Sequence, residues 1–223
     1  MTVPTALDYA VPAYFHPAVA RHEWHVLATH AAELRFVVVN VHNGVGDHFE
    51  ALYSEVTEEL LAAGVRLVGY VDSAYGERPV SEIVAEAHAY QDRYAITGVF
   101  LDQASSDLES LTQYEKYLLG LRAAGTRFVV LNPGVHPHPG YIDLANVTVT
   151  YEGSWEEYEQ MVEPPWVLSR PPSRFCHLVY ETPWAIGADP VSAMAGRHTR
   201  TVCLTEGEAP NVWGRLPTVL EQA

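Results

Sequence analysis

Short apolar runs rich in β-branched residues recur along the whole chain, and segments with helical periodicity separate most of them. Most runs end in a polar or acidic residue beside glycine or proline, which is typical of buried parallel strands. The pattern therefore predicts a (β/α)8 barrel, and we expect one barrel domain over residues 1–223. The eight runs occupy residues 11–15, 36–40, 67–71, 98–102, 128–132, 147–152, 176–181 and 201–206.

Helix signals alternate with these strands. Residues 47–50 have the form of a capping box, which predicts a helix ending near Ala63, before Gly64. The connection at residues 136–144 is too rich in proline for a good helix and is the weakest unit of the pattern. Further helices are expected to begin near Pro79, at Asp107 or a preceding serine, at a second capping box at 154–157 and at an Asp189 N-cap, with a short closing helix over 213–220.

Carboxylates stand at the ends of several predicted strands. In a barrel, the C-terminal ends of the strands line one shared mouth, where chemistry is done. Asp102 ends the fourth strand and Glu152 the sixth, and the helix after each has a nearer residue to cap it. Neither acid is needed to begin a helix, so we predict that both are catalytic. Asp72, Glu181 and Glu206 are further carboxylates at strand ends.

Polar and aromatic side chains near the other strand ends predict the substrate-binding part of the mouth. Amide, hydroxyl and carboxylate groups can hold polar substrates, and aromatic faces such as that of Trp184 can stack against a ring. Gln103 cannot transfer a proton, although it can bond a hydroxyl or an N-acetyl group. The substrate-binding residues we expect are Tyr14, His16, Asn40, His42, Tyr70, Asp72, Tyr75, Gln103, Asn132, Glu181 and Glu206.

Eleven histidines raise the question of a metal site. The chain lacks His-Glu-x-x-His and Cys-x-x-Cys spacings, and the pair His136-Pro-His138 lies in a predicted loop. We therefore expect no catalytic metal and no cofactor. His16 and His42 follow the first two strands, and either one is suited to be a general base near neutral pH.

The charge of the chain limits its partners. With 28 acidic and 13 basic residues, the formal net charge is −15, which argues against nucleic acid or an anionic membrane as partner. A neutral or cationic substrate suits this charge better, although the excess acid also serves solubility. Cys176 and Cys203 both fall in predicted strands and are expected to be buried thiols. We see no signal peptide and no membrane span, and we expect a cytoplasmic protein, or a secreted one if a leader has been removed.

Several segments, in this order, resemble the spherulin-4-like family (spherulation-specific family 4), and the similarity covers nearly the whole chain. The resemblance implies a (β/α)8 glycoside hydrolase that cuts α-linked amino-sugar polysaccharides such as galactosaminogalactan. The matching segments are 11–14 with Trp24, 39–40 with 43–46, 69–71 with 75–76 and Arg78, 97–102, 131–134, 150–152 and 216–217.

The chain departs from the family pattern at two positions. Family members typically have an adjacent Asp-Glu pair at the end of the fourth strand and a Glu at the end of the sixth. Asp102 and Glu152 match the first and the last acid, whereas Gln103 replaces the middle one. His42 stands where a proline often follows Asn40. The resemblance favours Asp102 as nucleophile or base and Glu152 as general acid, and the reverse assignment stays open.

Three functions follow from these observations. The first is a glycosidase that uses two carboxylates, because glycoside hydrolysis needs one ionised and one protonated carboxyl group. The second is an intracellular acid–base enzyme, such as a cyclase, isomerase or lyase, acting on a small molecule in a biosynthetic pathway. Gln103 and the two histidines, His16 and His42, favour it. The third is a carbohydrate-binding barrel that has lost turnover together with the family's middle acid.

Overall fold

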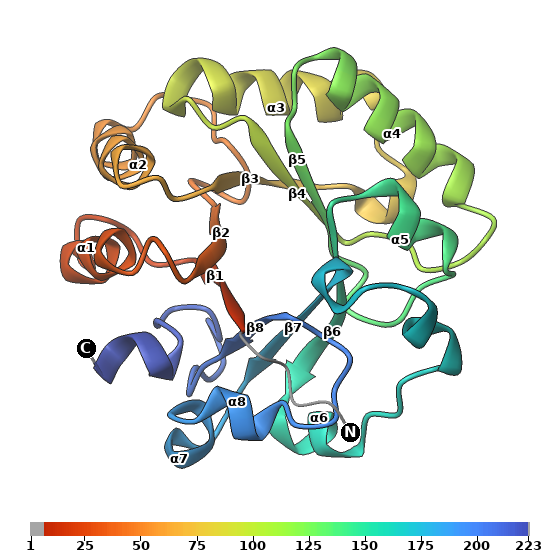
Figure 1. The fold of residues 1–223 in the computed structure, drawn as a ribbon. Coiled ribbons are helices and arrows are strands. Elements are labelled where there is room, and N and C mark those ends of the chain that lie inside the picture. Colours follow the sequence, from red (N-terminus) through yellow and green to blue (C-terminus); the bar gives the residue numbers. More distant parts are fainter. Residues whose placement is uncertain (1–6, 223) are drawn as a thin grey trace.

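The computed structural model describes residues 7–222 and forms a closed barrel of eight parallel strands (Figure 1). Each strand pairs with the next one along the chain, and β1 pairs with β8 to close the ring. The prediction of a (β/α)8 barrel is therefore confirmed. The strands are β1 Asp8–Ala13, β2 Leu34–Val39, β3 Leu67–Asp72, β4 Gly98–Asp102, β5 Phe128–Leu131, β6 Val147–Ser154, β7 Phe175–Tyr180 and β8 Thr201–Leu204.

Side chains of each strand alternate between the barrel interior and the helical shell, because successive residues of a strand face opposite sides. In β4, Phe100 packs in the interior cluster, whereas Val99 and Leu101 pack in the cluster under the helices. The interior also holds Phe36 of β2, which packs against Phe100 with ring centroids 6.5 Å apart. Because the interior is filled, the barrel is a packed core and not a pore, and strand ends rather than its middle can line a substrate site.

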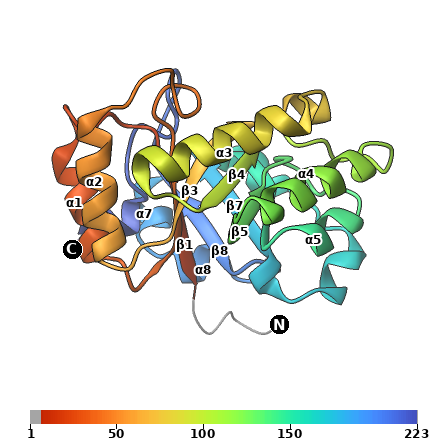
Figure 2. The ribbon, with the colours of Figure 1, turned by 90° about the horizontal axis from the view of Figure 1, so that it is seen from above.

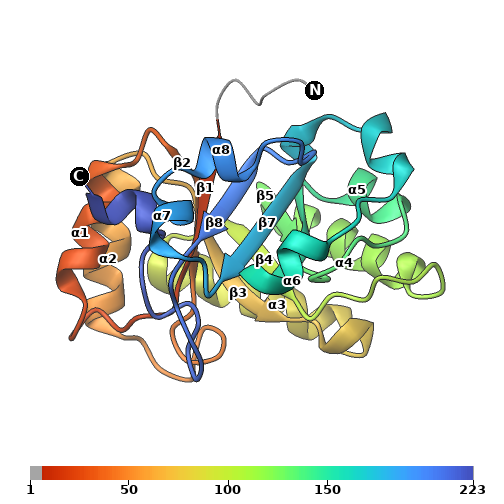
Figure 3. The same ribbon diagram turned by 90° about the horizontal axis from the view of Figure 1, so that it is seen from below.

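The helices differ between the two halves of the chain. The first four helices are α1 Arg21–Thr29, α2 Ala51–Ala62, α3 Val80–Tyr94 and α4 Leu111–Ala123. The last four are α5 Gly140–Leu144, α6 Trp155–Gln160, α7 Trp184–Gly187 and α8 Pro190–Ala193. Figure 2 shows the side covered by α3 and α4, and Figure 3 the side where β7 and β8 lie between the short α6, α7 and α8. Short 3₁₀ segments complete the chain at η1 Ala74–Gly76, η2 Pro165–Ser169, η3 Pro172–Arg174 and η4 Thr218–Gln222.

The predicted helix caps have mixed outcomes. The prediction of a capping box at residues 47–50 is wrong, because α2 begins after Glu50 and no side chain caps it. The Arg93 guanidinium binds the backbone there instead and donates to the carbonyl oxygen of Gly46 at 2.7 Å. The cap at Ser154 is confirmed, since its hydroxyl accepts from the backbone N–H of Glu157 at 3.3 Å. The Asp189 cap is also confirmed.

Two further expectations need correction. A short helix, α5, forms within residues 136–144 once the prolines have passed, so the fifth unit is weak but present. The closing helix predicted over 213–220 is wrong, because the last helical segment begins only at Thr218. Trp213 lies in a turn and packs in the barrel interior, edge-on to Tyr180 with centroids 5.8 Å apart. The Trp213 side chain therefore fills part of the barrel interior, and the segment around it is irregular and not helical.

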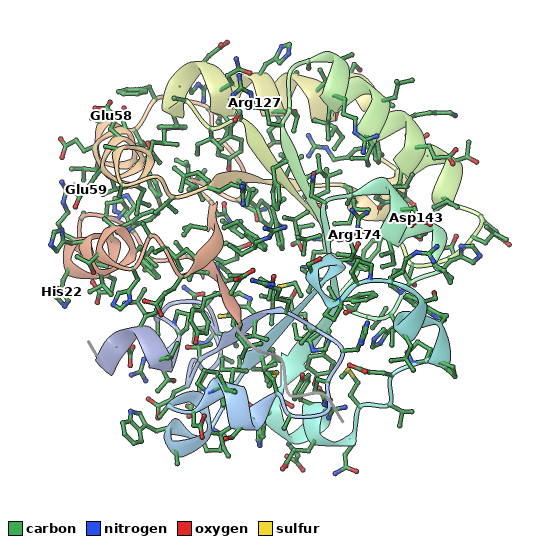
Figure 4. The ribbon with its side chains drawn as sticks, in the orientation of Figure 1. His22, Glu58, Glu59, Arg127, Asp143 and Arg174 are labelled. Carbon is green, nitrogen blue, oxygen red and sulfur yellow. The ribbon has the colours of Figure 1, made fainter. Side chains whose placement is uncertain are left out.

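The two cysteines and the polar surface agree with the sequence. Cys176 on β7 and Cys203 on β8 are free and buried in the interior, as predicted. Charged side chains such as Glu58 and Glu59 of α2 point outward from the shell (Figure 4). No helix within residues 7–222 is long and apolar enough to cross a membrane.

Candidate active site

Two carboxylates share one side-chain amide at the C-terminal end of the barrel. Asn132, directly after β5, donates from Nδ2 to Asp102 Oδ1 at 2.7 Å and to Glu152 Oε2 at 2.5 Å. Both oxygens bond the same nitrogen. The distance between Asp102 Oδ1 and Glu152 Oε2 therefore cannot exceed the sum of the two hydrogen-bond lengths, about 5.2 Å. Strands β4 and β6, which have only β5 between them, thus bring their acids to one place.

The orientation of this amide is fixed by the backbone. Asn132 is buried, and its Oδ1 accepts from the N–H of Gly134 at 3.1 Å. Since the carbonyl end is occupied in this way, the amino end must face the two carboxylates. The main chain of Asn132 is held as well, because its N–H donates to Leu101 and its carbonyl oxygen accepts from Ala104, both at 2.9 Å.

Asp102 is surrounded by hydrogen-bond donors. Its carboxylate accepts from the Tyr70 hydroxyl, the Asn132 amide and the backbone N–H of Gln103. Burial raises the pKa of Asp102 above its ordinary value and the nearby charge of Asp72 raises it further, whereas the three donors act in the opposite direction. Tyr70 reaches Asp102 because β3 and β4 are neighbours, with Asp72 paired to Asp102 in register.

Glu152 has the same amide neighbour but different surroundings. Burial raises the pKa of its carboxyl group, and the charge of Asp102 adds to this effect. Two donors oppose it: Asn132, and Trp213, whose Nε1 lies 3.3 Å from Glu152 Oε1. Sequence reasoning missed Trp213, because the segment that carries it was predicted as a helix. The signal was an aromatic residue in the irregular stretch after the last strand.

A β-bulge turns Glu152 into the barrel. Val149 packs in the interior and pairs with Cys176, and Tyr151 pairs with the next residue of β7, so Thr150 is an extra residue in β6. Regular alternation from Val149 would point Glu152 outward, since it lies three residues later. The bulge changes the phase, so that Tyr151 packs toward the shell and Glu152 faces Asn132.

Two tyrosines lie beside the carboxylate pair. Tyr14, directly after β1, packs against the interior cluster and lies edge-on to Tyr70, with ring centroids 6.0 Å apart. Burial raises the pKa of both phenols well above their ordinary value, and the charges of Asp102 and Glu152 raise them further. Both hydroxyls are therefore protonated near neutral pH and can donate hydrogen bonds.

The loops after β3 and β4 form a rim beside Asp102. Asp72 Oδ1 accepts from the backbone N–H of Ala74 at 2.7 Å, so it shapes its own turn. Gln103 is exposed and has a left-handed backbone, with φ of 48°, and its carbonyl oxygen accepts from Tyr75 at 2.8 Å. Tyr75 also has a positive φ, and 62 % of it is exposed. Strained residues of this kind often cluster at functional sites.

Three predicted residues belong to the loops after β1 and β2. Asn40 Oδ1 accepts from the backbone N–H of Gly44 at 2.9 Å, which closes the turn after β2. His16 Nδ1 accepts from the N–H of Ala18 at 3.1 Å, and its ring lies edge-on to Tyr53. His42 is exposed. Within residues 7–222, none of these three side chains bonds Asn132, Asp102 or Glu152.

The two remaining predicted carboxylates are placed differently from Asp102 and Glu152. Glu181 follows β7, has a positive φ of 52° and is exposed. Glu206 follows β8 and forms an ion pair with Arg215 at 3.4 Å, and Arg215 also reaches Glu221 at 3.6 Å. Glu206 therefore belongs to an ion-pair network with Arg215 and Glu221, separate from Asp102 and Glu152.

Comparison with known proteins adds a family to this geometry. The sequence model of spherulation-specific family 4 matches residues 8–223. Spherulin-4 of Physarum polycephalum is 30 % identical over 147 residues, which are 64 % of this chain and 43 % of spherulin-4. The match therefore spans less than half the length of that relative.

Solved structures share the barrel. The crystal structure of Aspergillus clavatus Sph3 in complex with GalNAc superposes with a TM-score of 0.83 at 19 % identity, over 99 % of this chain and 97 % of Sph3. A sugar phosphate isomerase/epimerase from Parabacteroides distasonis reaches a TM-score of 0.54 at 7 % identity, over 97 % of each chain. At these identities the likeness shows the fold, and the chemistry must be argued from the site.

Proposed function

Because the chain belongs to spherulation-specific family 4, we propose that it is a glycoside hydrolase acting on saccharides with α-linked amino sugars. The observation that carries this proposal is the amide of Asn132, which bonds Asp102 and Glu152 at once. Two carboxyl groups held this close are what cleavage of a glycosidic bond requires. The amino-sugar class is supported by the GalNAc bound to Sph3.

The separation of the two acids favours retention of the anomeric configuration. Retaining glycosidases hold their carboxyl groups about 5–5.5 Å apart, whereas inverting enzymes need about 6.5–9.5 Å to admit a water molecule. The bonded oxygens of Asp102 and Glu152 lie no more than about 5.2 Å apart. We therefore assign a double displacement.

In the first step, an Asp102 oxygen attacks the anomeric carbon and forms an ester bond, while the bond to the glycosidic oxygen breaks. Glu152 gives its proton to that leaving oxygen. In the second step, the ionised Glu152 takes a proton from water, which attacks the anomeric carbon and releases Asp102. Donors from Tyr70, Asn132 and the Gln103 backbone favour an ionised Asp102, and burial favours a protonated Glu152.

The surrounding groups suit a sugar substrate. The protonated hydroxyl of Tyr14 can donate to a ring substituent, and the exposed face of Tyr75 can stack against a sugar ring. The Tyr70 hydroxyl donates to Asp102 and can accept from a sugar hydroxyl. Gln103, which replaces an acid of the family pattern, offers an amide to an N-acetyl group. The net charge of −15 favours neutral or cationic sugars, such as galactosamine units without an acetyl group.

The test is hydrolysis of α-linked N-acetylgalactosamine and galactosamine oligomers by the purified protein. We expect Asp102→Asn and Glu152→Gln each to lower kcat at least about a thousandfold, because each removes one half of the acid pair. His22→Ala on α1, at the periphery of the barrel, is the control and should leave kcat unchanged (Figure 4). Hydrolysis at the original rate in both variants would contradict the proposal.

The same material separates the alternatives. An acid–base enzyme acting on a small molecule would depend on His16 or His42, so the variants His16→Ala and His42→Ala would lose its activity. The Nδ1 of His16 is already bonded to its own loop, which favours the carboxylate pair. A barrel that only binds carbohydrate would give a saccharide isotherm in calorimetry with no product released over days.

A further inference from the structure

A second cluster of potential ligands lies on the outer side of β6 and β7. His177 of β7 stands between Cys176 and Leu178, which pack in the interior, so its imidazole faces the shell. His136 belongs to the loop between β5 and α5, and Glu163 to the segment between α6 and η2. One ligand atom of each of these three side chains lies within 4.8 Å of the other two.

Among residues 7–222, the His177 ring bonds a partner through Nδ1 alone, which leaves Nε2 available. Its Nδ1 lies 2.8 Å from the Tyr158 hydroxyl, and that hydroxyl donates to the sulfur of Met194 at 3.2 Å. A thioether sulfur can only accept. With the hydroxyl hydrogen directed to it, the Tyr158 oxygen accepts from Nδ1–H and Nε2 carries the lone pair. This is how metal-binding histidines are oriented in proteins, with one nitrogen donating to a fixed neighbour and the other facing the ion.

The side chains of the other two ligands, Glu163 and His136, are also held in position. Both oxygens of Glu163 accept from the backbone N–H of His198, at 2.9 and 3.2 Å, which fixes the direction of the carboxylate. The His136 ring lies edge-on to Trp166 and to His177, with ring centroids 6.1 and 6.4 Å apart, which holds it beside the other two ligands.

A cavity of about 630 Å³ adjoins the cluster. His136 and Tyr151 line it, and the Tyr151 ring lies 6.3 Å from that of His177. Thr150, the extra residue of the bulge, lines the same cavity, and its buried hydroxyl has no hydrogen-bond partner within residues 7–222.

We propose that His136, Glu163 and His177 bind one divalent transition-metal ion of the Zn²⁺ type, with the remaining position open to this cavity. Two imidazoles and one carboxylate form a known three-ligand zinc set. Bonds of about 2.0–2.1 Å in tetrahedral geometry need ligand atoms about 3.3 Å apart, and the three ligand atoms already lie within 4.8 Å of one another, so only small side-chain movements are needed on binding. The positive charge of Arg197, which lies near His177, disfavours a bound cation. The negative charge of the Glu163 carboxylate offsets this repulsion.

The site is connected to the carboxylate pair through the loop after β5. Gly134 lies two residues before His136, and its carbonyl oxygen accepts from the backbone N–H of Glu152 at 2.9 Å. Asn132, at the start of the loop, bridges the two acids. An ion on His136 would hold this loop to β7 and should raise the thermal unfolding midpoint of the protein.

The test uses chelator-treated protein and two probes, Zn²⁺ in calorimetry and Co²⁺ in visible spectroscopy. We expect one equivalent of each to bind and Co²⁺ to give the intense bands of a tetrahedral site. His136→Ala and Glu163→Gln change partly exposed side chains and should each weaken Zn²⁺ binding at least about tenfold. His22→Ala removes an exposed histidine elsewhere and should change nothing (Figure 4).

Three results would overturn the inference. They are no binding of Zn²⁺ to the folded protein, affinity unchanged in both His136→Ala and Glu163→Gln, and Co²⁺ bands that are lost equally in His22→Ala. Circular dichroism of each variant shows that the fold is intact, so that weakened binding reports the loss of a ligand. None of these measurements depends on saccharide hydrolysis, so their outcome stands apart from that of the proposed glycosidase.

Discussion

The two halves of the barrel are built differently. Helices α1 to α4 have 9, 12, 15 and 13 residues, whereas α5 to α8 have 5, 6, 4 and 4. The regular half supplies Tyr70 and Asp102 from the ends of its strands. The irregular half supplies Asn132, Glu152 and Trp213, and it also contains the bulge, the cavity and the histidine cluster.

This difference separates stability from chemistry. Each of the helices α3 and α4 buries four side chains against the barrel, which is where apolar burial is concentrated. The short helices leave room for loops that hold polar groups in fixed positions. Changes in the loops of the irregular half should therefore alter activity, and changes in the long helices of the regular half should alter stability alone.

The largest effect is expected from exchanging two residues in the double variant Tyr151→Glu/Glu152→Tyr. The bulge directs residue 151 to the helical shell and residue 152 to the barrel interior, so the exchanged carboxylate faces outward and the exchanged ring inward. Hydrolysis should fall at least about a thousandfold, because the acid pair is broken. The matched control is Thr150→Val, which leaves residues 151 and 152 in place and removes only an unpartnered hydroxyl, and it should retain kcat. If the exchanged variant folds and keeps its activity, the bulge does not place Glu152.

Asn132→Ala should have the next largest effect. The substitution removes the donor shared by the two carboxylates, and loss of one such donor costs about a hundredfold to a thousandfold in kcat. Asn132 lowers the pKa of both acids, so its removal should also move the acidic limb of the pH–rate profile to higher pH. A profile with an unchanged acidic limb would mean that the amide does not act on the pair.

Glu152→Gln should stabilise the protein. Burial raises the pKa of Glu152, so the folded state holds the proton more tightly than the unfolded chain. The stabilisation from this proton is complete below the ordinary carboxyl pKa and is lost as the pH rises through the raised value. The free energy of unfolding of the variant should exceed that of the wild type at pH 7 and match it near pH 3.5. Urea titration at both pH values measures this, and a variant less stable at pH 7 would refute it.

The smallest effect belongs to the regular half. Ala95 follows α3 in the left-handed region, with φ of 56° and ψ of 22°. Glycine adopts this conformation without the steric penalty of a Cβ atom, so Ala95→Gly should raise the free energy of unfolding by up to about 1 kcal/mol. Hydrolysis should be unchanged. A change in kcat would show that the two halves are not separable in this way.

Local patterns in the sequence predict the regular half well. The β-branched runs locate all eight strands, because strand formation depends on nearby residues and burial. The positions of Asp102 and Glu152 at the ends of β4 and β6 follow from the same β-branched runs. The short α5 and the segment that carries Trp213 were harder to predict from the sequence. Trp213 packs in the barrel interior, and local sequence does not show which side chain fills that space.

The bulge and the histidine cluster lie beyond such patterns. Residues 147–152 alternate regularly in sequence, and only the pairing with β7 reveals that Thr150 is extra. His136, Glu163 and His177 have no metal-binding spacing along the chain, and the folding of β5, β6 and β7 side by side brings them together. Both features arise from register and topology, which act between distant residues.

The configuration of the released sugar tests the paired carboxylates most directly. Proton NMR during the first minutes of hydrolysis distinguishes the α from the β anomer of the new reducing end before they equilibrate. A close Asp102–Glu152 pair predicts that an α-linked substrate first gives the α anomer. Initial appearance of the β anomer would contradict the double displacement and the spacing on which it rests.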